Sequence, residues 1–152
     1  MTSVQVLSRS LVWDNHIVPT VRPDDSRFLG QLKRYRNAGF RVVGLNAGWD
    51  AVGPLHCLKM LAQFRHWIRG AGEEYVLLEK AGDLRQLGRR LGVFFDIEGG
   101  AALDGQLSMV ELYRDLGVRW MLIAYNRNNA LGGGCQDIDR GLTSSADALS
   151  RK

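Results

Sequence analysis

Short apolar runs alternate along this chain with longer amphipathic segments, and a glycine or an acidic residue marks most of the boundaries. The apolar runs are rich in β-branched and aromatic residues and predict strands. The amphipathic segments carry apolar residues at helical spacing and predict helices. The predicted strands are residues 11–13, 41–45, 75–78, 93–97 and 119–125, and the predicted helices are residues 24–39, 55–69, 83–91 and 106–116.

Nearly continuous apolar strands that alternate with helices through short connections are typical of a parallel α/β arrangement. Because crossovers between parallel strands are right-handed, the carboxyl ends of such strands meet at one edge of the sheet. Open α/β sheets and closed (β/α)8 barrels both bind their ligands at this edge. Functional residues are therefore expected directly after the predicted strands.

Polar residues do follow one predicted strand after another. Glu98 is the most specific of them, because it ends an apolar strand and precedes two glycines. A buried carboxylate has to be paired or bind a metal, and Asp96 would share a face of the strand with Glu98. A carboxylate pair satisfied by arginines or backbone amides is the alternative. The other polar residues at strand ends are Asp14, His16, Asn46, Tyr125, Asn126 and Asn129.

The segment Asp14-Asn15-His16 places a carboxylate and an imidazole within one turn of chain. Zinc accepts this combination of ligands. A loop histidine that forms only local hydrogen bonds explains the same residues.

Other conspicuous residues have simpler interpretations. Residues 132–134 are three glycines without a phosphate-binding motif, so they predict a flexible loop. His56 and His66 lie on different faces of one predicted helix and are expected to be exposed or half-buried. Cys135 has no histidine or asparagine at a spacing that would make it a nucleophile.

Composition narrows the class of protein. The chain has 152 residues, of which 45% are apolar, and a formal charge of +4 without a long run of like charges. These values predict one globular domain and disfavour nucleic acid as a partner. The basic residues at 33–36 are the main argument for nucleic-acid binding, and a solvated helix face explains them equally well.

Targeting and redox signals are also absent from the sequence pattern. The first residues lack the apolar core of a signal peptide, and no apolar run approaches the length of a membrane span. Two cysteines without C-x-x-C spacing indicate neither a disulfide framework nor a thiolate zinc site. We therefore expect a cytoplasmic protein that does not bind membranes.

Three segments stand in a specific order and spacing: they read FDIEGG at residues 95–100, GVRWMLIAYN at 117–126 and GLT at 141–143. They resemble the membrane (renal-type) dipeptidase family, and the similarity runs from about residue 12 to residue 143. Members of this family are zinc-dependent dipeptidases built on a (β/α)8 barrel. The resemblance thus implies a TIM-type barrel fold, a zinc cofactor and hydrolysis of a dipeptide-like substrate.

The resemblance also implies roles for single residues. His16 is similar to the metal-binding histidine that follows the first strand of the family. Glu98 is similar to the glutamate that bridges two metals, which makes it the expected catalytic residue. Tyr125, Asn126 and Asn129 are then expected to bind substrate, and Asp14 and Asp96 are expected to contact the ligands rather than the metal.

The chain departs from the family pattern at several points. Val18 stands where the family has a carboxylate ligand, and Tyr125 stands where it has a histidine. A complete barrel takes about 250 residues, so residues 1–143 are expected to form the amino-terminal half of one. Residues 144–152 no longer follow the family pattern.

Two functions from different classes remain. The first is a truncated metallodipeptidase that is inactive alone, because a catalytic zinc usually has three protein ligands. The second is a non-catalytic half-barrel that forms a homo-oligomer or needs a protein partner, because a half-barrel exposes strand edges and apolar faces.

Overall fold

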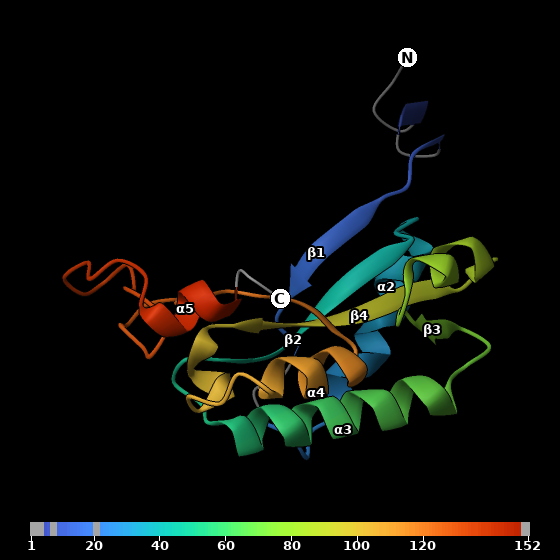
Figure 1. Ribbon diagram of the computed structural model, residues 1–152. Coiled ribbons are helices and arrows are strands. Elements are labelled where there is room, and N and C mark those ends of the chain that lie inside the picture. The colour runs from blue at the N-terminus through green and yellow to red at the C-terminus, as the bar shows by residue number, and fades with distance from the viewer. Residues whose placement is uncertain (1–4, 7–8, 20–21, 150–152) are drawn as a thin grey trace. The chain divides into compact units, whose positions relative to one another are not determined.

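The computed structural model describes residues 5–6, 9–19 and 22–149. By its internal contacts the chain divides into two compact units that are interleaved in sequence. The first unit comprises Met1–Leu45 and Ala62–Phe94, and the second comprises Asn46–Leu61 and Phe95–Lys152. Strands alternate with helices in both units, as the sequence predicts (Figure 1).

The first unit contains four strands in the hydrogen-bonded order β1-β2-β4-β3. They are β1 (Trp13–Ile17), the beginning of β2 (Val42–Trp49), the beginning of β4 (Leu91–Glu98) and β3 (Tyr75–Leu77). The β1–β2 and β3–β4 pairs are both parallel. The helical elements are a 3-10 turn at Arg27–Gln31, α2 (Leu32–Asn37), the second part of α3 (Pro54–Gly70) and a 3-10 turn at Ala81–Gln86.

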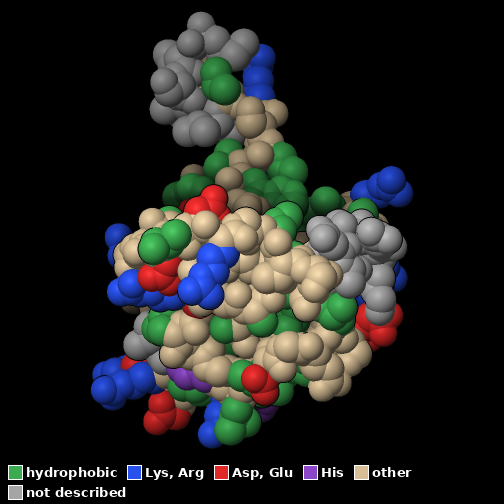
Figure 2. Space-filling view, turned by 60° about the vertical axis from the view of Figure 1, so that its left-hand side comes forward, with side chains coloured by type: hydrophobic (Ala, Val, Ile, Leu, Met, Phe, Trp, Pro, Cys, Tyr) green, Lys and Arg blue, Asp and Glu red, His purple; other side chains and the backbone are tan. Residues whose placement is uncertain are grey.

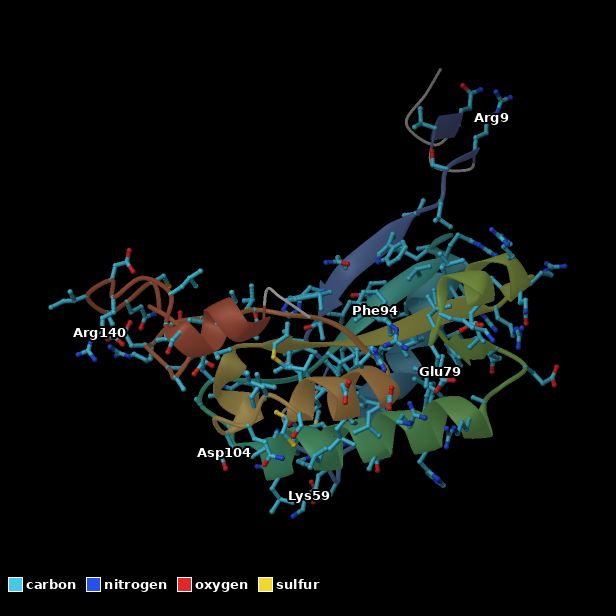
Figure 3. All side chains as sticks on the ribbon, in the orientation of Figure 1. Arg9, Lys59, Glu79, Phe94, Asp104 and Arg140 are labelled. Atoms are coloured by element: carbon cyan, nitrogen blue, oxygen red, sulfur yellow. The ribbon has the colours of Figure 1, made fainter. Side chains whose placement is uncertain are left out.

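Aromatic packing anchors the sheet of the first unit. Phe94, which is labelled on β4 in Figure 3, is 2% exposed, and its ring lies 5.7 Å from the ring of Trp13 on β1. A Cβ atom at Gly44 on β2 would overlap this phenylalanine ring. Glycine is therefore required at this position of β2, because any side chain there would collide with the Phe94 ring of β4.

The second unit contains the carboxyl-terminal parts of β2 and β4, together with β5 (Val118–Met121). β5 is parallel to β4, with Asp96 opposite Trp120 and Ile97 opposite Met121. The helical elements are the first part of α3, a 3-10 turn at Gly100–Leu103, α4 (Met109–Asp115) and α5 (Ser144–Leu149). Tyr113 on α4 is 1% exposed and donates a 2.9 Å hydrogen bond to the carbonyl of Ala102.

The parallel α/β class is confirmed, but several predicted boundaries are wrong. β1 begins at Trp13 and includes Asp14 and His16, which the sequence predicts to follow the strand. Its side chains alternate between more and less buried positions, so the strand continues through polar residues that the apolar pattern does not detect. β2 likewise continues to Trp49 and contains Asn46.

The end of β5 and the two weakest helices also differ from the prediction. β5 ends at Met121 rather than at residue 125. The residues beyond it contact the segment after β4, where the N–H of Gly100 donates a hydrogen bond to the carbonyl of Ile123. The predicted helix 24–39 is a 3-10 turn followed by a single short α-helix. The predicted helix 83–91 is a 3-10 turn that ends at Gln86, and residue Leu91 already belongs to β4.

The distribution of charged, cysteine and histidine side chains can be compared with what the sequence predicts. On the face shown in Figure 2, basic and acidic side chains are interspersed. Within the described parts of the chain, we find no helix that is long and apolar enough to span a membrane. Cys57 is buried and Cys135 is exposed, and both are free thiols, as the cysteine spacing predicts. His66 is exposed and His56 is half-buried, which confirms their expected positions.

Candidate active site

Glu98 ends β4 in the second unit, as the sequence predicts, and its side chain is half-buried. The two glycines after it are both buried and closely packed. A Cβ atom at Gly99 would overlap the carboxylate of Asp50, and one at Gly100 would overlap Leu131. Gly99 also has a φ angle of 125°, which disfavours other residues. The Glu-Gly-Gly sequence therefore reflects the close approach of two other segments to the end of β4.

Asp96 lies two residues before Glu98 and is completely buried. Its Oδ1 accepts a 3.1 Å hydrogen bond from the side-chain amide of Asn46 on β2. The Oδ1 of Asn46 in turn accepts a 3.0 Å hydrogen bond from the backbone N–H of Gly48. Asn46 was expected to follow its strand, but it lies within β2, as Asp96 lies within β4, so their geometry fits a polar contact that joins the two strands.

Asp50 directly follows β2, and sequence reasoning missed it. Its Oδ1 accepts hydrogen bonds from the backbone N–H of Ala101 at 3.1 Å and from the Nδ2 of Asn129 at 3.1 Å. Its Oδ2 accepts one from the backbone N–H of Tyr125 at 3.0 Å. The rule that points to Glu98, a carboxylate at the end of an apolar strand, also applies to Asp50 once β2 is known to continue to Trp49.

The side chain of Asn129 is engaged on both sides. Its Nδ2 donates to Asp50 and, at 2.8 Å, to the carbonyl of Ile123. Its Oδ1 accepts from the backbone N–H groups of Leu131 and Gly132 at 2.8 and 3.2 Å. These contacts hold the loop that follows β5, so the geometry favours a loop-forming role for Asn129 over direct contact with a substrate.

The rest of this loop is also hydrogen-bonded. The carboxylate of Asp137 accepts from the backbone N–H of Asn128 at 2.7 Å and from Arg127 Nη1 at 2.8 Å, and these contacts lower the pKa of Asp137. Gly134 donates to the Oδ1 of Asn128, and Gly132 pairs with Leu142 in an antiparallel bridge. The three glycines predicted as a flexible loop thus belong to an extensively hydrogen-bonded turn, while Arg140 extends from its outer side (Figure 3).

These segments of the second unit enclose a cavity of about 320 Å³. Tyr125, which is 36% exposed, and Asn126 both border it. The Oδ1 of Asn126 accepts a 3.2 Å hydrogen bond from the side chain of Gln136. The other residues around the cavity are Trp49, Asp50, Ala51, Ala101, Arg127, Asn128 and Asn129. The three residues expected to bind substrate are thereby brought together at one cavity.

Asp14 and His16 lie on β1 in the first unit. His16 is half-buried, and its backbone N–H donates a 3.2 Å hydrogen bond to the Oδ1 of Asp14. The contact between the two residues is therefore local. That His16 binds the same metal as Glu98 stays a prediction.

The side chains that the structure describes indicate whether these residues alone could hold a zinc ion. Those residues contain no group of three or more histidine, cysteine, aspartate or glutamate side chains that could hold a metal. In the second unit, Asp50 and Asp96 accept hydrogen bonds from amides. A catalytic zinc usually has three protein ligands, so this donor set does not fit such a zinc by itself.

A family profile identifies the family of this chain, and solved structures identify its fold. The sequence profile of the membrane dipeptidase family, peptidase family M19, matches residues 55–152. An amidohydrolase from Pseudomonas aeruginosa superimposes with a TM-score of 0.86 at 18% identity, over 99% of this chain and 45% of that protein. A metallopeptidase of family M19, dipeptidase AC, superimposes with a TM-score of 0.73 at 17% identity, over 92% of this chain and 53% of that protein.

The chain thus spans about half the length of each of these structures. A search of curated proteins gave no match. The parallel βα repeats therefore correspond to roughly half of a (β/α)8 barrel, as the sequence predicts.

Proposed function

Because the chain belongs to the membrane dipeptidase family (peptidase family M19), we propose that it forms part of a zinc-dependent dipeptidase active site in which Glu98 binds the metal. The observation that carries this proposal is the position of Glu98. It ends an apolar parallel strand, and two tightly packed glycines follow it before Ala101, which borders the cavity. Barrel enzymes place catalytic residues at this end of their strands.

The proposed metal centre requires more than this chain offers among its described residues. His16 and Glu98 are the two ligands that the family resemblance assigns, and a third is needed for a catalytic zinc. We propose that the missing ligands come from another segment or another chain. Bound zinc would supply Lewis acidity and lower the pKa of a coordinated water.

On the substrate side, the chain's own residues would bind and orient a dipeptide. The hydroxyl of Tyr125 can donate and accept hydrogen bonds at the cavity. Asn126 presents an amide to the same cavity. Asn129 would act indirectly by holding the loop in place, since its amide contacts Asp50 and the backbone.

A second candidate is a non-catalytic half-barrel that self-associates. The observation that favours it is apolar surface beside β5 in the second unit: Leu122, Ile123 and Leu142 are 37%, 39% and 62% exposed. A groove of about 310 Å³ between α4 and β5 is lined mostly by apolar side chains, including Val110 and Met121. Exposed apolar patches of this kind favour association. Sedimentation at several concentrations tests this candidate, and a concentration-independent monomer would contradict it.

Zinc affinity tests the metal role. The full chain is titrated against a chromophoric zinc chelator, and Glu98→Gln and His16→Ala are compared with Glu79→Gln. Glu79 is a suitable control because it is an exposed acid that pairs with Arg65. Glu98→Gln and His16→Ala should each weaken zinc binding by at least about tenfold, because loss of even an outer-shell partner of a ligand costs about 10–100-fold, while Glu79→Gln leaves it unchanged. Unchanged affinity in Glu98→Gln would overturn the proposal.

A further inference from the structure

We infer that Asp50 is a positioning residue that holds the end of β4 and the Tyr125 loop together, an inference that rests on the proposed function. The two segments that it joins are the ones on which that function depends. One contains Glu98 and the glycines after it, and the other contains Tyr125 and Asn129.

The carboxylate of Asp50 contacts both segments. Its Oδ1 accepts from the N–H of Ala101, three residues after Glu98, and its Oδ2 accepts from the N–H of Tyr125. Asn129 Nδ2 lies 3.1 and 3.3 Å from the two oxygens. Both carboxylate oxygens are therefore used to fix backbone and loop positions. This arrangement favours a positioning role over metal binding.

The backbone of Asp50 adds a second connection to β4. Its N–H donates a 2.9 Å hydrogen bond to the carbonyl of Glu98. Side chain and backbone of one residue thus fix the main chain on both sides of Gly99. The direction in which Glu98 leaves the strand depends on that main chain, so displacement of Asp50 would move the proposed metal ligand.

A carboxyl group satisfies this set of donors, whereas an amide of the same shape does not. Each oxygen of an ionised aspartate accepts hydrogen bonds and neither donates. An asparagine of the same shape has one accepting oxygen and one donating nitrogen. Whichever way that amide is oriented, the N–H of Ala101 or the N–H of Tyr125 would face another donor. Hydrogen bonds to a charged acceptor are also stronger than those to a neutral one.

The test is amide hydrogen exchange and proton chemical shift by NMR on the full chain, comparing Asp50→Asn with Asp137→Asn. Asp137 is a matched control, because its carboxylate also accepts a backbone N–H and a side-chain donor of this loop but does not contact Ala101 or Tyr125. Thermal melting confirms that each variant is folded.

Asp50→Asn should shift the Tyr125 or Ala101 amide proton upfield and speed its exchange by about tenfold or more. Asp137→Asn should do so only at Asn128. If the amides of Ala101 and Tyr125 have the same chemical shifts and exchange rates in Asp50→Asn as in the wild type, the inference is overturned. A titration with glycyl-leucine separates the two claims. If the dipeptide shifts the Tyr125 amide signal in the wild type and shifts it less in Asp50→Asn, both the substrate role of this loop and the positioning role of Asp50 are supported. If the dipeptide shifts no Tyr125 signal in the wild type, the substrate role fails, and the exchange data still decide the role of Asp50.

Discussion

The carboxylate of Asp50 occupies the space that a side chain at Gly99 would need. The two residues directly follow different strands, β2 and β4, and the φ angle of 125° at Gly99 adds a second reason for glycine. The shape of the chain after Glu98 therefore depends on a residue about fifty positions earlier in the sequence.

Gly99→Ala is predicted to lower the free energy of unfolding by about 2–5 kcal/mol, because backbone strain and steric overlap add together. Gly105→Ala separates the two effects. Gly105 also has a positive φ angle, 73°, but no atom lies within 4 Å of the point that a Cβ atom would occupy there, so its loss should be about 1 kcal/mol. Urea unfolding measures both, and equal losses would contradict the steric account.

Asn46→Ala is predicted to destabilise the second unit by about 1–3 kcal/mol. The substitution removes the amide that donates to buried Asp96 and the oxygen that accepts from the N–H of Gly48. Asn128→Ala is the comparison, since its side-chain contact with Gly134 is only partly buried and its contact with Ile138 is exposed. If Asn46→Ala costs no more than Asn128→Ala in urea unfolding, the buried pair does not join the strands as described.

The fold class and the most prominent acid were predictable from the sequence, because both depend on local patterns. The apolar run ending in Glu98 specifies a buried strand and the residue at which it ends without any distant contact. The first strand was predicted at residues 11–13, but β1 runs from Trp13 to Ile17 because polar residues continue it. These residues are Asp14, Asn15 and His16. The contacts of Asp50 with Ala101 and Tyr125 span 51 and 75 positions, and no local pattern encodes such a pairing.

The face of α3 illustrates the same limit. The apolar spacing of residues 55–69 predicts a helix with a buried stripe through Leu58, Leu61, Ala62 and Ile68. Leu61 and Ile68 are buried, but Leu58 is half-buried and Ala62 is exposed. Cys57, Met60 and Phe64 complete the buried face. A rotation of the helix by about one residue changes its packing without changing its period, and only tertiary contacts decide between the two.

The two thiols are predicted to react at very different rates. Cys135 is exposed, whereas Cys57 is fully buried and burial raises its pKa to about 11. Since the thiolate is the reactive form, Cys57 should be inert at pH 8 in the folded chain. A colorimetric thiol assay should therefore detect one fast equivalent, which Cys135→Ser removes. Two fast equivalents would show that the packing around Cys57 opens readily.

Stability is predicted to fall at alkaline pH partly through Tyr113. Burial raises the pKa of Tyr113 above its usual value, while the unfolded chain titrates near a pKa of about 10. The unfolded state thus loses its proton first, and the contribution of this group is present below pH 10 and is lost as the pH rises above it. Tyr113→Phe should be less stable than wild type at pH 8 but should lose less stability between pH 9 and 11. If urea unfolding shows that the wild type and Tyr113→Phe lose the same stability between pH 9 and 11, this prediction is contradicted.

The position of a bound metal tests the central proposal most directly. Crystals of the full chain are soaked with zinc, and anomalous difference maps are recorded on both sides of the zinc absorption edge. The proposal predicts an anomalous peak about 2.0–2.2 Å from a carboxylate oxygen of Glu98, which Glu98→Gln abolishes. A zinc peak at other side chains with none at Glu98, or a peak that persists in Glu98→Gln, would contradict the assignment of Glu98 as a metal ligand.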